Sequence, residues 1–119
     1  MGQTAFDIFI LGAGPAGVSA ALTAKNRGRS VAVLSSDPAN TPLAKAHRID
    51  NYPGLTGMSG AEMLSAMADS LKAQDIPVIT ARATGVMSFG KKLMVSAGQD
   101  VYEAKTLILA VGAQQAAKP

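Results

Sequence analysis

The chain has 119 residues, of which 48% are hydrophobic and 16% charged, so it can bury one core and is expected to form a single domain. It contains no cysteine, which excludes disulfides, thiolate metal sites and thiol chemistry within these residues. The formal net charge of +3 is scattered and no apolar run could span a membrane, so we expect a cytoplasmic protein that binds neither nucleic acid nor membranes.

The first 35 residues predict a strand, a helix and a second strand. Residues 6–11 form a short apolar run that is typical of a buried parallel strand. The sequence becomes helical at Pro15, because proline suits a first helical turn, and Gly28 suits the end of that helix. Residues 30–34 predict the next parallel strand, which completes a βαβ unit.

The rest of the chain predicts a loop, a second helix, a small meander and a last strand. Residues 36–57 hold three prolines and are expected to form a long irregular loop. Ser59 and Glu62 make a capping box, which marks the start of the second helix. Residues 107–111 predict another parallel strand. Three short apolar runs between turns indicate an antiparallel meander: residues 78–79, 93–95 and 101–102.

Three glycines between the first strand and the first helix carry the main functional signal. Gly12, Gly14 and Gly17 fit the pattern G-x-G-x-x-G. In that pattern the first glycine allows a tight turn, the second lets the backbone approach a pyrophosphate, and the third lets the helix pack closely on the sheet. The motif predicts dinucleotide binding at the positive end of the helix, and the alternative is a glycine turn that only joins strand to helix.

Serines stand at the end of the second strand, where such sites normally have an acidic residue for the ribose. Ser35 and Ser36 can still hydrogen-bond a ribose hydroxyl, although residues 36–38 also fit a simple turn. No basic residue stands there to receive a 2′-phosphate, which weighs against NADP. His47 is the sole histidine, so no Ser-His-Asp triad can be argued from spacing and no His-cluster metal site can be assembled.

Three segments together resemble the thioredoxin reductase family of flavoproteins. They are residues 6–35, residues 49–54 with the sequence IDNYPG, and residues 107–113 with the sequence LILAVGA. The likeness covers nearly the whole chain but only the N-terminal part of the family's FAD domain. We therefore expect residues 1–119 to be a Rossmann-like three-layer α/β domain, with a parallel sheet, helices on one face and a β-meander crossover on the other.

The resemblance implies FAD as the cofactor and gives roles to individual residues. Ser35 and Ser36 would lie near the adenosine ribose, and the backbone of Arg82 and Ala83 would border the adenine. Asn51 would face the flavin, whereas without the resemblance it reads as a turn residue. Six residues would surround the diphosphate: Gly12, Gly14, Pro15, Ala16, Ala110 and Gly112.

The sequence also departs from the family pattern. Asn40-Thr41-Pro42 stands where members usually have Gly-Gly-Gln, Val111 replaces a usual threonine, and Ala116 replaces a basic residue. The family's redox-active cysteine pair and pyridine-nucleotide domain would lie beyond Pro119. We therefore expect the FAD-binding portion of a thioredoxin-reductase-like oxidoreductase, with no catalytic residues and no reductase turnover of its own.

Two other hypotheses remain open. One is a flavin-free truncated module that acts through self-association, since an incomplete FAD domain leaves sheet edges and apolar surface uncovered. For the same reason we expect a homodimer or a partner chain that completes the fold. The other is a small NAD-binding module, which Ser35 in place of an acid makes the weaker alternative.

Overall fold

The computed structural model describes residues 4–35 and 45–111, which form two helices and one six-stranded sheet. The elements in chain order are β1 (Ala5–Leu11), α1 (Pro15–Asn26), β2 (Val31–Ser35), α2 (Gly60–Ala73), β3 (Val78–Thr80), β4 (Ala83–Phe89), β5 (Lys92–Ala97) and β6 (Asp100–Leu109). The strand order is β3-β2-β1-β6-β5-β4. The first four of these strands run parallel, while β4, β5 and β6 are antiparallel neighbours.

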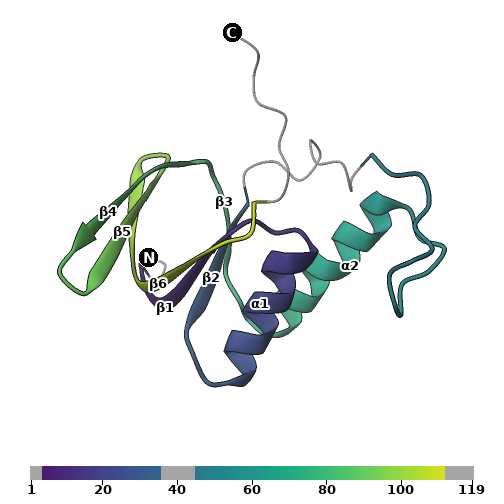
Figure 1. The fold of residues 1–119 in the computed structure, drawn as a ribbon, viewed down its shortest axis with the longest axis horizontal. Coiled ribbons are helices and arrows are strands. Elements are labelled where there is room, and N and C mark those ends of the chain that lie inside the picture. Colours follow the sequence, from purple (N-terminus) through teal and green to yellow (C-terminus); the bar gives the residue numbers. More distant parts are fainter. Residues whose placement is uncertain (1–3, 36–44, 112–119) are drawn as a thin grey trace, which may run out of the picture.

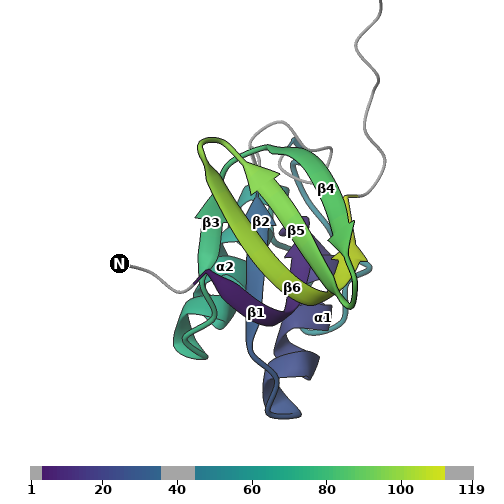
Figure 2. The same cartoon turned by 90° about the vertical axis from the view of Figure 1, so that its left-hand side faces the viewer.

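The molecule has three layers, as expected from the sequence. Both helices lie on one face of the parallel strands, and the β4–β5 hairpin curls over the other face (Figures 1 and 2). Alternate residues of the central strands feed two separate cores, because successive side chains of a strand point to opposite faces. Ile10 and Val33 pack with the helices. Phe9 and Leu34 pack with the meander.

The βαβ unit at the N-terminal end forms as predicted. Pro15 is the first residue of α1, and Gly28, with φ of +80°, follows the end of that helix. All five residues of β2 are buried, because this strand has a neighbour on each side and a layer on each face. β1 and β2 pair in parallel, for example Ile10 with Val33.

Helix α2 begins with the predicted capping box. The Ser59 hydroxyl accepts a hydrogen bond from the Glu62 N–H (3.2 Å), and the Glu62 carboxylate accepts one from the Ser59 N–H (3.1 Å). These bonds favour the charged carboxylate, so the Ser59 backbone and side chain lower the pKa of Glu62. Neither helix of the described residues is long and apolar enough to cross a membrane.

Two predictions about the strands were wrong. Residues 78–79 do not belong to the meander but lie in β3, which pairs in parallel with β2 after α2 has crossed over the sheet. Residues 101–102 and 107–109 are not two strands but parts of one ten-residue strand, β6, which ends at Leu109 rather than residue 111. The first half of β6 pairs with β5 and the second half with β1, so one strand serves both the meander and the parallel sheet.

An ionic cluster fastens the amino end of the sheet. The Asp7 carboxylate accepts a hydrogen bond from the Ser30 N–H (2.9 Å), and the Ser30 hydroxyl accepts one from the Asp7 N–H (2.8 Å). Lys105 of β6 adds an ion pair to Asp7 at 3.3 Å. The Ser30 backbone bond, helped by Lys105, lowers the pKa of Asp7. This cluster joins β1 to both neighbouring strands at the end of the sheet away from the glycine turn.

Candidate functional site

The predicted site lies where four parallel strands end at the same edge of the sheet. β1, β2, β3 and β6 all have their carboxyl ends at this edge. In open α/β sheets, ligands bind in the crevice outside the carboxyl ends of the strands. The glycine turn follows β1, Ser35 ends β2, and Ala110 follows β6, so the fold brings these predicted residues together.

Gly12 is required by the protein's own packing. Its φ is +120°, a conformation that side chains rarely adopt, and its N–H donates to the carbonyl of Leu34 at 2.9 Å. A Cβ atom here would overlap the carbonyl group of Ala110, whose N–H donates to Leu11 at 2.8 Å. The start of the turn is therefore pinned between the ends of β2 and β6.

Gly17 is also required by packing. It is buried in the first turn of α1, and a Cβ atom there would overlap the Gly12 carbonyl oxygen and lie 2.8 Å from the carbonyl carbon. Close contact between the helix and the turn after β1 thus depends on the missing side chain. This is the role that the sequence motif assigns to the third glycine.

Gly14 differs from the other two glycines of the motif. A Cβ atom added to it would have no atom of the described residues within 4 Å, so it faces open space among them. Its φ of −79° is one that any residue adopts, so backbone strain does not require glycine here either. The protein's own packing therefore explains Gly12 and Gly17 but leaves Gly14 without an internal reason.

The N-terminal end of α1 has free capacity to bind an anion. Gly14 is its N-cap, no side chain caps it, and its first turn contains no acidic residue. Pro15 has no N–H to offer, so the unsatisfied donors of this turn are those of Gly14, Ala16 and Gly17. Helix α2 is the opposite case, because its own Ser59 and Glu62 satisfy its first turn.

Ser35 lies beside a hollow that sequence reasoning missed. The residue is buried, and its carbonyl accepts a hydrogen bond from the N–H of Ala81 at 3.1 Å. The hollow has a volume of about 260 Å³ and lies between α2 and the ends of β2 and β3. It is lined by Ala13, Ser35, Leu64, Ser65, Ala68, Leu71, Val78 and Thr80. The one signal in the sequence is the i, i+4, i+7 spacing of residues 64, 68 and 71, which places them on one face of the helix. That spacing does not show which strands this face lies against.

Of the remaining predicted residues, two are exposed, one packs against the core and two lie outside the described residues. Arg82 is exposed just after β3, while Ala83 begins β4 and packs with the core on the meander side. Asn51 is exposed in the irregular segment 45–59. Ser36 and Gly112 lie outside the described residues, as do the departures at residues 40–42 and 116.

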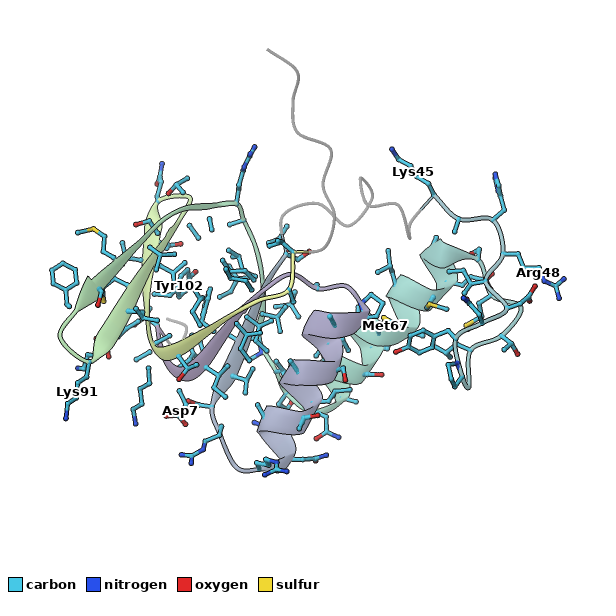
Figure 3. All side chains as sticks on the ribbon, in the orientation of Figure 1. Asp7, Lys45, Arg48, Met67, Lys91 and Tyr102 are labelled. Carbon is cyan, nitrogen blue, oxygen red and sulfur yellow. The ribbon has the colours of Figure 1, made fainter. Side chains whose placement is uncertain are left out.

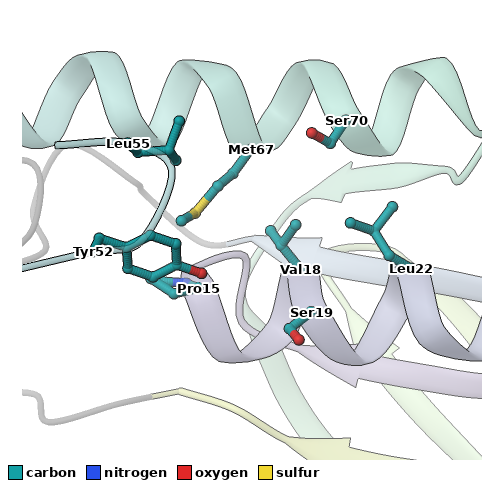
Figure 4. A pocket seen from close by; sticks show the side chains of 8 residues that line it. All are labelled: Pro15, Val18, Ser19, Leu22, Tyr52, Leu55, Met67 and Ser70. Carbon is teal, nitrogen blue, oxygen red and sulfur yellow. The ribbon is translucent and has the colours of Figure 1, made fainter. Parts of the chain in front are cut away.

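The segment that carries Asn51 meets the helix-side core through the next residue, Tyr52. Tyr52 and Leu55 of this segment line a second hollow, of about 210 Å³, together with Pro15 and Val18 of α1 and Met67 of α2 (Figure 4). Sequence reasoning overlooked Tyr52, although the resemblance rested partly on the NYPG stretch that contains it. The structure thus brings the Asn51 segment to the first turn of α1.

Basic side chains stand at both ends of the molecule. Lys45 and Arg48 project from the segment beside the N-terminal end of α2, and Arg48 pairs with Asp50 at 2.9 Å (Figure 3). Lys91 projects from the β4–β5 turn at the opposite end of the molecule. The N-terminal end of α1 adds the partial positive charge of the helix dipole at the glycine turn.

A parallel sheet with helices on one face, a meander on the other and a glycine turn at its carboxyl edge is a Rossmann-like fold of the dinucleotide-binding type. Comparison with known proteins agrees with this assignment. Residues 6–119 match the family described as pyridine nucleotide-disulphide oxidoreductase, and the chain belongs to this family.

Its relatives include thioredoxin reductases, as the sequence resemblance predicted. The enzyme of Aquifex aeolicus is 35% identical over 115 residues, which cover 94% of this chain and 35% of the relative. A solved thioredoxin reductase from Gloeobacter violaceus has a TM-score of 0.91 and 31% identity, over 99% of this chain and 40% of that one. A ferredoxin-flavin thioredoxin reductase from Clostridium acetobutylicum has a TM-score of 0.85 and 36% identity, over 97% of this chain and 40% of that one. The chain thus spans about a third of the length of the Aquifex relative.

Proposed function

We propose that residues 1–119 are the FAD-binding portion of a thioredoxin-reductase-like flavoprotein. The observation that carries this proposal is the open space at Gly14, beside a helix start that no side chain caps. A dinucleotide diphosphate fits such a place, because it needs close backbone approach and N–H donors at the positive end of a helix. The similarity to the ferredoxin-flavin thioredoxin reductase of Clostridium acetobutylicum, whose name includes a flavin, supports FAD as the dinucleotide.

Each predicted residue has a part in this proposal. Gly12, Gly14, Pro15 and Ala16 form the turn that would hold the diphosphate, with Ala110 and Gly112 beside it. Ser35 and Ser36 would hydrogen-bond the adenosine ribose, and the backbone of Arg82 and Ala83 would border the adenine. Asn51 would contact the flavin side of the cofactor.

The 119 residues would bind the cofactor without completing a reductase cycle. In flavoproteins of this family, bound flavin passes electrons between a pyridine nucleotide and a disulfide. These residues contain no cysteine, so they supply no disulfide for that transfer. We expect the chain alone to show no disulfide reduction with NADPH at enzyme-like rates, and such activity would contradict the proposal.

Substitution of Gly14 by alanine tests the proposed cofactor site. The new Cβ atom meets no atom in the part of the chain that the structure describes, so the fold should lose only about 1 kcal/mol through the poorer N-cap. The same atom would occupy the space intended for the diphosphate, so FAD affinity should fall roughly tenfold or more. The measurement is a titration of the purified chain with FAD, followed by flavin fluorescence and visible absorbance.

Gly85 supplies a matched control for this experiment. It also has open space at its Cβ position and no positive φ, but it lies in β4, away from the glycine turn. Gly85→Ala should therefore leave FAD binding unchanged. Equal FAD affinity of the Gly14→Ala and Gly85→Ala variants would refute a diphosphate site at Gly14.

A second candidate function is self-association without flavin, and one observation favours it. β4 is an edge strand without charged residues, and its Met87 and Phe89 side chains are 58% and 59% exposed. Edge strands of this kind pair readily with another chain. A colourless dimer that is unmoved by excess FAD and becomes monomeric on Met87→Lys substitution would support this candidate over the first.

A further inference from the structure

We infer that Tyr52 is a positioning residue, which holds the segment 45–59 and its Asn51 against the first turn of α1. The inference rests on the proposed FAD site, in which Asn51 contacts the flavin side of the cofactor. It adds a residue that is expected to act through another one rather than by touching the cofactor itself.

The segment 45–59 is tied to itself and to α2. The N–H of Ile49 donates to the carbonyl of Met58 at 2.7 Å, and the N–H of Gly57 donates to the carbonyl of Ile49 at 2.8 Å. The N–H of Gly60, the first residue of α2, donates to the carbonyl of Ala46 at 2.8 Å. Among the described residues, we find no hydrogen bond from this segment to α1. The segment is thus a small folded loop at the N-terminal end of α2 (Figure 1).

Contact between this loop and α1 is made by side chains. Tyr52 and Leu55 are the loop residues that line the hollow shared with α1, and both pack against the core on the helix side. In Figure 4 Tyr52, Pro15 and Met67 border the same hollow. Tyr52 packs against the core cluster that includes Val18 of α1 and Met67 of α2, so its ring lies where the loop meets both helices.

This contact links the two ends of the proposed cofactor site. Pro15 directly follows Gly14 at the diphosphate end, and Asn51 directly precedes Tyr52 at the flavin end. Since consecutive Cα atoms are about 3.8 Å apart, packing of the Tyr52 ring against the helix-side core also restrains Asn51 relative to the turn. A loop that leaves this position for most of the time would reduce the apparent FAD affinity by the fraction of time spent away.

Packing alone is the competing explanation, and the same hollow offers a control for it. Leu22 lines the hollow from one turn further along α1 than Val18 and belongs to no part of the loop (Figure 4). Leu22→Ala removes apolar contacts of α1 but leaves Tyr52 and the loop unchanged in sequence. It should lower the melting temperature without changing FAD affinity.

The test compares Tyr52→Leu, Tyr52→Phe and Leu22→Ala in the 119-residue chain, with FAD and ADP as separate ligands. ADP carries the adenosine and the diphosphate but no flavin. Tyr52→Leu should weaken FAD binding on the order of tenfold and leave ADP binding within about twofold, because only the flavin end is released. Tyr52→Phe keeps the ring and should restore both the FAD affinity and the visible circular dichroism of the bound flavin.

The outcomes separate this inference from the proposed function. Equal weakening of FAD and ADP in Tyr52→Leu would make Tyr52 a general packing residue and overturn its positioning role. Unchanged FAD affinity in Tyr52→Leu would overturn it as well. A wild-type chain that binds neither ligand would overturn the proposed function and, with it, the role of Tyr52.

Discussion

Substitution of Gly17 by alanine sets helix propensity against tertiary packing. Alanine in a helix is about 1 kcal/mol more favourable than glycine, so propensity alone predicts a more stable protein. In the structure, the added Cβ atom would overlap the Gly12 carbonyl oxygen and lie 2.8 Å from its carbon. Carbon atoms in contact prefer about 3.5 Å, so the contact with the carbonyl carbon alone requires α1 to move about 0.7 Å away from the turn after β1, and the closer oxygen requires more.

The expected net effect is destabilisation by about 2 kcal/mol. Overpacking costs about 1–3 kcal/mol, and the upper end applies because the obstacle is backbone rather than a flexible side chain. Subtracting the propensity gain of about 1 kcal/mol leaves about 2 kcal/mol, or about 8 °C in melting temperature for a domain of this size. The assay is urea unfolding followed by circular dichroism.

Gly85→Ala again serves as the control, because its Cβ position is open and it should not be destabilised. A Gly17→Ala variant as stable as the wild type, or more stable, would refute the claim that the helix packs on the turn through this glycine.

Three further predictions concern stability. Folding lowers the pKa of Asp7, so the charged carboxylate stabilises the fold above the unfolded pKa near 3.8, and this stabilisation is lost as pH falls through the folded pKa. The difference in unfolding free energy between wild type and Asp7→Asn should therefore disappear in acid. A difference that stays constant from pH 7 to 2 in chemical unfolding would contradict this. Ser59→Ala should lower the free energy of unfolding by about 1 kcal/mol in urea. It should also raise the pKa of Glu62 toward its ordinary value, which an NMR titration of the carboxyl group would show. An unchanged pKa would mean that the capping box is not formed in solution. Met63→Ala should cost about 2–5 kcal/mol, because the side chain is 1% exposed, whereas Met87→Ala on the exposed edge should cost less than about 0.5 kcal/mol; similar losses would contradict the burial of Met63.

Local signals in the sequence located most of the regular elements. Pro15 and Gly28 bounded α1, and the Ser59–Glu62 pair marked the start of α2. These signals worked because capping and turn formation involve residues only a few positions apart, and the chemistry that satisfies the backbone is visible in those residues. The βαβ unit and its glycine turn followed from the same local rules.

The errors in strand assignment have a different origin. Residues 78–79 form a strand too short to reveal whether its neighbour is parallel, and that neighbour, β2, lies more than 40 residues earlier in the chain. Residues 103–106 contain two charged residues, which interrupt the apolar pattern between residues 101–102 and 107–109. In the structure these charges are held by partners on neighbouring strands, since Glu103 pairs with Lys92 and Lys105 pairs with Asp7.

For the candidate site, too, some features were visible in the sequence and others only in the tertiary structure. The motif by itself indicated which three glycines matter, but it could not separate glycines required by packing from one that leaves room for a ligand. That separation depends on where β6 and α1 come to lie, because Ala110 crowds Gly12 and the Gly12 carbonyl crowds Gly17, whereas no atom of residues 4–35 and 45–111 approaches the Cβ position of Gly14. The sequence alone thus determined the class of fold and the place of the turn. Only the tertiary structure decided which surface stays open and which side chains, Tyr52 among them, hold its borders, because these depend on contacts between residues far apart in the chain.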